Sequence, residues 1–203
     1  MDTTVEEEAD RPIRQWGRTR TTRRTILEAA REVFTEDGYE RANIAHIVAR
    51  SGLSVGSVYH HFSGKSDLFI SLWDEYEQGN RAAAEDAVAQ ARRAGEGSPV
   101  ELFVIGTRAY LANALLNAKT TLLFSGNEGP AGFDALGQES GARWLENNLR
   151  LLRLPDDEPS RLTARILTRA VSEGARAAAT LDGDPAVEAV VEKTLEIVRR
   201  LAA

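Results

Sequence analysis

The chain has 203 residues, of which 42% are apolar and 28% are charged. This composition is typical of a folded globular protein and excludes full disorder. No apolar run reaches the roughly 18 residues needed to cross a bilayer, so we expect no membrane partner. The chain contains no cysteine, which excludes disulfides and thiolate catalysis and favours a cytoplasmic protein. The first ten residues are acidic, so we expect no secretory signal.

The net charge of −6 hides an uneven distribution along the chain. Residues 1–10 carry −5, residues 11–65 carry ten basic and five acidic side chains, and the remainder carries −6. Six arginines occur in residues 11–24 without an acidic residue among them. Such asymmetry predicts a basic surface on an acidic protein. A nucleic-acid-binding arm is one interpretation, and a solvated arm without a partner is the other.

Four short apolar stripes at helical spacing follow one another over residues 26–76, and glycines at positions 38, 52 and 64 separate them. Each stripe is too small to bury itself alone, so together they predict a compact helical head of about 60 residues. Gly38 is placed as a left-handed stop for the first helix.

The rest of the chain also has helical periodicity. The fourth helix continues to about Arg93, and Ser98 and Pro99 start a helix predicted over about 99–119. A loop over 124–133 and helices over about 134–153, 159–181 and 184 to the end follow. No strand pattern is present. The predicted fold is all-α, with an arm (1–21), a helix-turn-helix head (22–66), and a connecting helix and helical body (67–203).

The most informative segment runs from Asn43 to Lys65. A short helix, a tight turn at Gly52 and a second short helix capped by Ser54 form a helix-turn-helix pattern. The second of these helices is suited to the major groove of DNA because small side chains at its start allow a close approach to base edges. Longer side chains beyond them could reach phosphates, and the next helix N-terminus adds amide donors.

We therefore predict a set of DNA-binding residues in the arm and the head. Two arginines of the arm would enter the minor groove, residues at the start of the recognition helix would face the bases, and the others would hold phosphates. The predicted set is Arg18, Arg20, Asn43, Ser54, Val55, Gly56, Ser57, Tyr59, His60 and Lys65.

The run IVARSGLSVGSVYHHFSGKSDLF, preceded by TILEAAREVFTEDGYE, resembles the DNA-binding head of TetR/AcrR transcriptional regulators over roughly residues 22–70. The chain departs from the family pattern at Ala42 and Asn43, where the family usually has two threonines, and at Gly64, where it often has serine. The resemblance implies a homodimer that binds double-stranded DNA at a palindromic operator. It also implies repression that is relieved when a small molecule of unknown identity enters the body.

A dimer interface is predicted from the last two helices. In the final helix apolar residues recur at spacings of four and three, as in a heptad seam, and the preceding helix has small residues that permit close approach. The predicted residues are Gly174, Ala178, Val187, Val191, Thr194 and Val198. Packing of the same faces inside one subunit is the alternative.

A ligand site is predicted from a half-polar stripe on the helix over 99–119 and a similar face on the helix over 134–153. Ligand sites are mostly apolar with a few placed polar groups. The predicted residues are Phe103, Tyr110, Asn113, Asn117, Phe124, Trp144 and Asn148. The alternative is that these are ordinary surface or core residues.

We find no catalytic constellation, no metal-binding set and no phosphate loop, so we expect neither an enzyme nor a cofactor. The three histidines all lie in the head, and His60 and His61 diverge on a helix instead of chelating one ion. The favoured function is a ligand-responsive DNA-binding regulator, most simply a repressor. A DNA-binding factor without ligand control is the alternative. The effector, the operator sequence and the regulated genes are left open.

Overall fold

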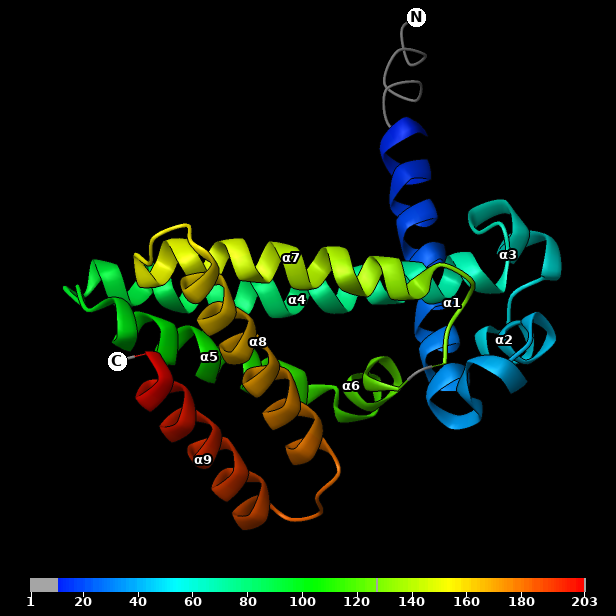
Figure 1. Cartoon of the computed structure of the whole chain (residues 1–203). Helices are drawn as coiled ribbons and strands as arrows, with labels where there is room; N and C mark the ends of the chain where they lie inside the picture. The colour runs from blue at the N-terminus through cyan, green and yellow to red at the C-terminus, as the bar shows by residue number, and fades with distance from the viewer. Residues whose placement is uncertain (1–10, 127, 203) are drawn as a thin grey trace, which may run out of the picture. The chain divides into compact units, whose positions relative to one another are not determined.

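A computed structural model describes residues 11–126 and 128–202, with only the backbone for residues 11–18. Within these residues the chain forms nine α-helices and no strand, which confirms the all-α prediction (Figure 1). The helices divide into two compact units, a head that ends at Leu72 and a body that starts at Trp73. The boundary falls inside one continuous helix. Within the described part of the chain, no helix is both long and apolar enough to cross a membrane.

The head consists of α1 (Arg11–Arg41), α2 (Ile44–Ser51), α3 (Val55–His61) and the beginning of α4 (Lys65–Arg93). Gly38 interrupts α1 with a φ of 76°, a left-handed conformation that favours glycine. The interruption lies where the sequence places the end of the first helix. Residues 11–21, predicted to belong to an arm ahead of the head, are helical and continue directly into the head.

The core of the head is formed by apolar side chains that the four stripes supply. Phe69 lies edge-on to Phe34 and Tyr39, with ring centroids 5.3 and 4.9 Å away, an arrangement that aromatic pairs prefer. Around these rings the fully buried side chains come from all four helices: Ile26, Leu27, Ile47, Val58 and Leu68. Short helices are held here by one shared core instead of by their own propensity.

The body contains the greater part of α4 and five further helices. These are α5 (Pro99–Leu116), α6 (Ala118–Ser125), α7 (Phe133–Leu152), α8 (Glu158–Ala179) and α9 (Asp184–Ala202). The main core lies between α5, α8 and α9, where Leu111, Leu167 and Leu195 are almost completely buried. In Figure 1 α7 lies along α4, and a hydrogen bond from Trp144 of α7 to Glu77 of α4 joins them.

The helix predicted over 99–119 is in fact two helices. The backbone turns at Asn117 (φ −126°, ψ 48°), and α6 begins at the next residue. The Thr121 hydroxyl donates to the Ala114 carbonyl (2.7 Å), which also accepts from the Asn117 amide (3.3 Å) at the end of α5. Apolar residues occur on both sides of Asn117, so the pattern of apolar residues does not predict the break.

Candidate nucleic-acid interface and effector cavity

The helix-turn-helix of the head is fixed by local caps. The Asn43 side chain accepts a hydrogen bond from the His46 amide (3.0 Å) at the start of α2. The Ser54 hydroxyl accepts one from the Ser57 amide (3.1 Å) at the start of α3. Between the two helices Gly52 has a φ of 67°. These caps satisfy amides that each helix leaves open and set the direction of both helices.

α3 buries one side and exposes the other. Val58 is fully buried and anchors the helix in the core, whereas Val55 and Tyr59 are 52% and 55% exposed. His60 is exposed as well, and at Gly56 the space around a Cβ position is open except for the Ser54 hydroxyl at 3.9 Å. The first turn of α3 is therefore free to approach another molecule closely.

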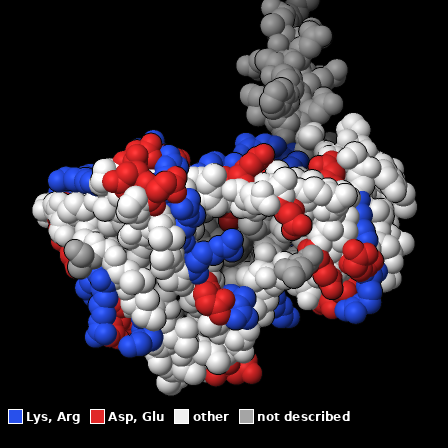
Figure 2. Space-filling model, in the orientation of Figure 1, with Lys and Arg blue, Asp and Glu red and all other residues white. Residues whose placement is uncertain are grey.

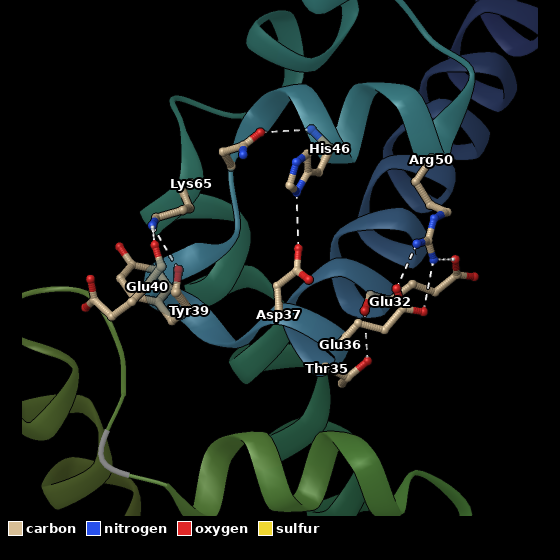
Figure 3. A network of polar contacts seen from close by, with 10 residues as sticks. Glu32, Thr35, Glu36, Asp37, Tyr39, Glu40, His46, Arg50 and Lys65 are labelled. Atoms are coloured by element: carbon tan, nitrogen blue, oxygen red, sulfur yellow. Dashed lines mark hydrogen bonds and ion pairs between the residues drawn. The ribbon is translucent and has the colours of Figure 1, made fainter.

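Lys65, predicted to hold a phosphate, is already engaged within the head. Its Nζ donates to the carbonyl oxygens of Tyr39 (2.9 Å) and Glu40 (3.3 Å) and lies 4.3 Å from the centre of the Tyr39 ring. These carbonyls follow the kink in α1, so Lys65 caps that end of the helix (Figure 3). In this structure Lys65 is a structural residue, and a phosphate contact would have to share its ammonium group.

Other basic side chains of the head are likewise paired inside it. The guanidinium nitrogens of Arg50 on α2 lie 2.8 Å from a carboxylate oxygen of Glu32 and 2.7 Å from one of Glu36, both on α1 (Figure 3). The hydrogen bonds to Glu36 and Glu32 raise the pKa of Arg50. Arg23 lies 4.9 Å from the centre of the Phe62 ring and donates to Ser71 (3.3 Å). Of the two predicted minor-groove arginines, Arg20 is exposed. The Arg18 side chain lies outside the described residues.

The body contains a cavity of about 470 Å³ between α4, α5, α7 and α8. Its apolar lining comes from all four helices: Ala84, Val88, Ala89, Phe103, Gly106, Trp144, Leu151 and Val171. Polar side chains also line it: Glu85, Arg92, Thr107, Tyr110, Asn147, Asn148, Arg150, Thr168 and Ser172. A cavity of this size and mixed lining is typical of a site for a small organic molecule.

Four of the seven predicted ligand residues line this cavity: Phe103, Tyr110, Trp144 and Asn148. The other three do not, and the prediction is corrected for them. Asn113 turns toward α4 and donates to Asn80 (2.8 Å), and Asn117 is exposed at the break between α5 and α6. Phe124 packs against Trp73 with ring centroids 5.2 Å apart and lines a different hollow.

Tyr110 is a partly buried polar residue of the cavity wall. Burial raises its pKa well above the ordinary value of 10, and the neighbouring Tyr76 and Glu77 act in the same direction. Its ring lies edge-on to Trp144, with centroids 5.5 Å apart. The hydroxyl therefore stays protonated at neutral pH and can act as a hydrogen-bond donor inside the cavity.

The predicted dimer seam is instead the packing of α8 against α9 inside one chain. Ala178, Val191 and Val198 belong to the body core with at most 7% exposure, and Val187 packs at its edge. A Cβ atom at Gly174 would lie 2.4 Å from the Thr194 hydroxyl oxygen. The small residues do allow two helices to approach closely, but those helices are consecutive in the sequence.

Among the side chains that the structure describes, no three histidine or acidic residues come together to hold a metal ion. His60 and His61 have perpendicular rings with centroids 5.1 Å apart. Burial lowers the pKa of His61 below its ordinary value of 6.5, and the charges of His60 and Arg23 add to the effect.

The geometry of the head, two capped short helices joined by a glycine turn, defines a helix-turn-helix DNA-binding domain. Residues 26–72 match the family model described as bacterial regulatory proteins, tetR family. The head is therefore similar to the DNA-binding region of TetR-family regulators. The HTH-type transcriptional repressor AcnR of Corynebacterium diphtheriae is 39% identical over 80 residues, which cover 39% of this chain and 37% of the repressor. The match thus spans well under half of that relative's length.

The fold similarity extends over both units. A putative TetR-family transcriptional regulator from Syntrophomonas wolfei has a TM-score of 0.74 at 19% identity, over 90% of this chain and 95% of that chain. SmeT, in a complex with triclosan, has a TM-score of 0.66 at 21% identity, over 88% and 90%. The fold of the whole chain is that of TetR-family regulators.

Proposed function

We propose that the protein is a transcriptional repressor that binds a palindromic operator as a homodimer and releases it when a small molecule enters the body. The observation that carries this proposal is the exposed first turn of α3, held by the Ser54 cap and the buried Val58. An exposed helix start after a glycine turn is the part of this motif that reads bases in the major groove. A repressor of bacterial genes would act in the cytoplasm, where the chromosome lies.

DNA fragments selected from a random pool by the purified protein, followed by fluorescence anisotropy, test the DNA-binding part. Ser57→Ala should change discrimination at one base position by about 1–3 kcal/mol. Arg20→Ala should weaken binding to all sequences and reduce the salt slope by about 1. Lack of any selected sequence would contradict the proposal, and an unchanged preference in Ser57→Ala would remove that residue from base reading.

We place the dimer surface on the outward sides of α8 and α9. Leu162 and Ile166 on α8 are 53% and 47% exposed, and Ile197 and Leu201 on α9 are 41% and 47% exposed. Each pair is one helical turn apart, so each helix presents an apolar strip. Two such strips on neighbouring helices suit an isologous interface with a second copy of the chain.

Ile166→Lys combined with Ile197→Lys should give a folded monomer that binds the operator weakly, measured by analytical ultracentrifugation. Leu116→Lys is the matched control because Leu116 is 81% exposed on a different helix, α5. A dimer that survives the double change would place the interface elsewhere.

Ligand control is supported by the position of α4. The helix contributes Ala84, Val88 and Arg92 to the cavity wall, while its first residue, Lys65, caps α1 in the head. A ligand that favours one position of α4 would thereby affect the head. Coupling of 1–3 kcal/mol would lower operator affinity about 5- to 150-fold, and the operator would weaken ligand binding by the same factor.

Two neighbouring residues of α5 provide a matched test of the cavity. Tyr110→Ala should alter the affinity of any compound that releases the operator, because Tyr110 lines the cavity. Asn113→Ala, one turn away and outside the cavity, should leave that affinity unchanged. If no compound that binds the protein changes its operator affinity, the protein is a DNA-binding factor without ligand control.

A further inference from the structure

The cavity in the body has an apolar interior, and the charged side chains that line it carry a net positive charge. We propose that its ligand is an amphipathic carboxylic acid, with an apolar chain inside the cavity and a carboxylate held by Arg92 and Arg150. This inference rests on the proposed function only in taking the cavity as the effector site. The chemical class follows from the side chains themselves.

The apolar part of the ligand would contact Val88, Phe103, Leu151 and Val171, which lie on four different helices around the cavity. Two of the polar side chains in the interior are already hydrogen-bonded within the protein. The Asn148 amide donates to Thr168 (3.0 Å), and the Thr168 hydroxyl donates to the Ala164 carbonyl (2.8 Å). The interior therefore favours a chain with few polar groups.

The charged lining consists of two guanidinium groups and one carboxylate. Arg92 lies in the last turn of α4, Arg150 lies in the last turn of α7, and Glu85 lies two turns before Arg92. In Figure 1 the C-terminal ends of α4 and α7 lie at the same end of the body. The local charge is therefore positive, which favours an anionic group and disfavours a cationic one.

Seven of the thirteen arginines of the body are paired with carboxylates, and Figure 2 shows basic and acidic side chains interspersed on its visible face. Ion pairs within 4.0 Å involve Arg108, Arg143, Arg161, Arg165, Arg176, Arg199 and Arg200. In the described part of the chain the other six have no such partner, and Arg92 and Arg150 are the two of them that line this cavity. Arg150 instead donates to the Asn147 side chain (2.5 Å), which holds it beside the cavity.

Basic side chains at helix C-termini also complement the helix dipole, which accounts for arginines at these positions without any ligand. Arg93 provides the comparison, because it occupies the same last turn of α4 but does not line the cavity. A dipole effect would act on Arg92 and Arg93 alike. A role in binding a carboxylate would be restricted to Arg92 and Arg150.

The experiment compares three probes with the same twelve-carbon chain: dodecanoate and dodecylammonium below their micelle concentrations, and dodecan-1-ol below its solubility limit. Isothermal titration calorimetry on the full chain without DNA should give dodecanoate the tightest binding, about ten-fold or more over the alcohol. Arg92→Gln with Arg150→Gln should reduce dodecanoate affinity to that of the alcohol and leave alcohol affinity unchanged. Arg93→Gln should change neither, and Glu85→Gln should tighten dodecanoate binding.

Equal binding of acid and alcohol, tightest binding of dodecylammonium, or no binding of any probe would overturn the proposal. So would an effect of Arg93→Gln as large as that of the double change. Because these titrations contain no DNA, they are independent of the proposed repressor function. A preference for the acid without any effect on operator binding would retain the ligand class and contradict ligand control.

Discussion

The structure of the head follows from its local sequence more completely than the structure of the body does. In the head, the residues that set the structure act over three or four positions, as when Ser54 accepts from the amide of Ser57. In the body, the decisive contacts join distant residues, such as Asn113 with Asn80 and Gly174 with Thr194. A motif of local interactions can be recognised from residues in order, whereas a packed bundle of long helices depends on which faces meet.

The two units also use charge differently. In the head, Arg50 pairs with Glu32 and Glu36, and Lys65 donates to backbone carbonyls. Part of the positive charge of this segment therefore stabilises the head itself. In the body, ion pairs lie mainly on the surface, where each contributes little. The arginines that remain available beside a cavity are therefore more informative about ligands than the total charge.

The largest effect is expected where α8 meets α9. Gly174→Ala should destabilise the body by about 2 kcal/mol, because the added methyl group would lie 2.4 Å from the Thr194 hydroxyl and force the helices apart. Urea unfolding measures the free energy. Thr194→Ala in the same chain should restore part of the loss, because it removes the two closest atoms.

Gly137→Ala is the matched control for Gly174→Ala. Gly137 lies on the exposed side of α7 with no atom within 4 Å of a Cβ position, so the change should stabilise the protein by about 0.5–1 kcal/mol. If Gly174→Ala weakened the dimer and left unfolding of the isolated chain unchanged, the contact would belong between subunits after all.

A smaller effect is expected in the head. Ser54→Ala should destabilise it by about 1 kcal/mol, because the first turn of α3 loses the acceptor for the Ser57 amide. Ser57→Ala keeps that amide and should leave the free energy of unfolding unchanged while altering base preference. Circular dichroism during urea unfolding compares the two variants. Equal losses in both would contradict the assignment of Ser54 as the cap.

The smallest effect is a pH dependence from His61. Its pKa is lowered in the folded protein, chiefly by burial, so the folded state favours the neutral ring. The resulting stabilisation is complete above the ordinary pKa of 6.5 and decreases as the pH falls through 6.5 toward the lower folded value. Thermal unfolding midpoints across this range should decrease less in His61→Gln. Identical slopes in both proteins would show that His61 does not contribute.

The sequence by itself determined the helix-turn-helix, its caps and the glycine turns, because these depend on side chains and φ angles within a few residues. The sequence also identified a small part of the cavity lining, since Tyr110 and Trp144 stand out as polar-tipped aromatics on their helices. Tertiary structure alone decided that the small residues of α8 face α9 of the same chain. Periodicity identifies an apolar face but carries no information about which surface will cover it.

The same limit explains the remaining differences. α5 is buried on several sides, with Leu102, Phe103 and Val104 all in the core, so its pattern could not separate the cavity face from the packing face. Lys65 looked like a phosphate ligand because its partners, the carbonyls of Tyr39 and Glu40, lie some 25 residues earlier in the chain. Backbone acceptors are present at every residue, and only the folded head shows which of them a lysine reaches.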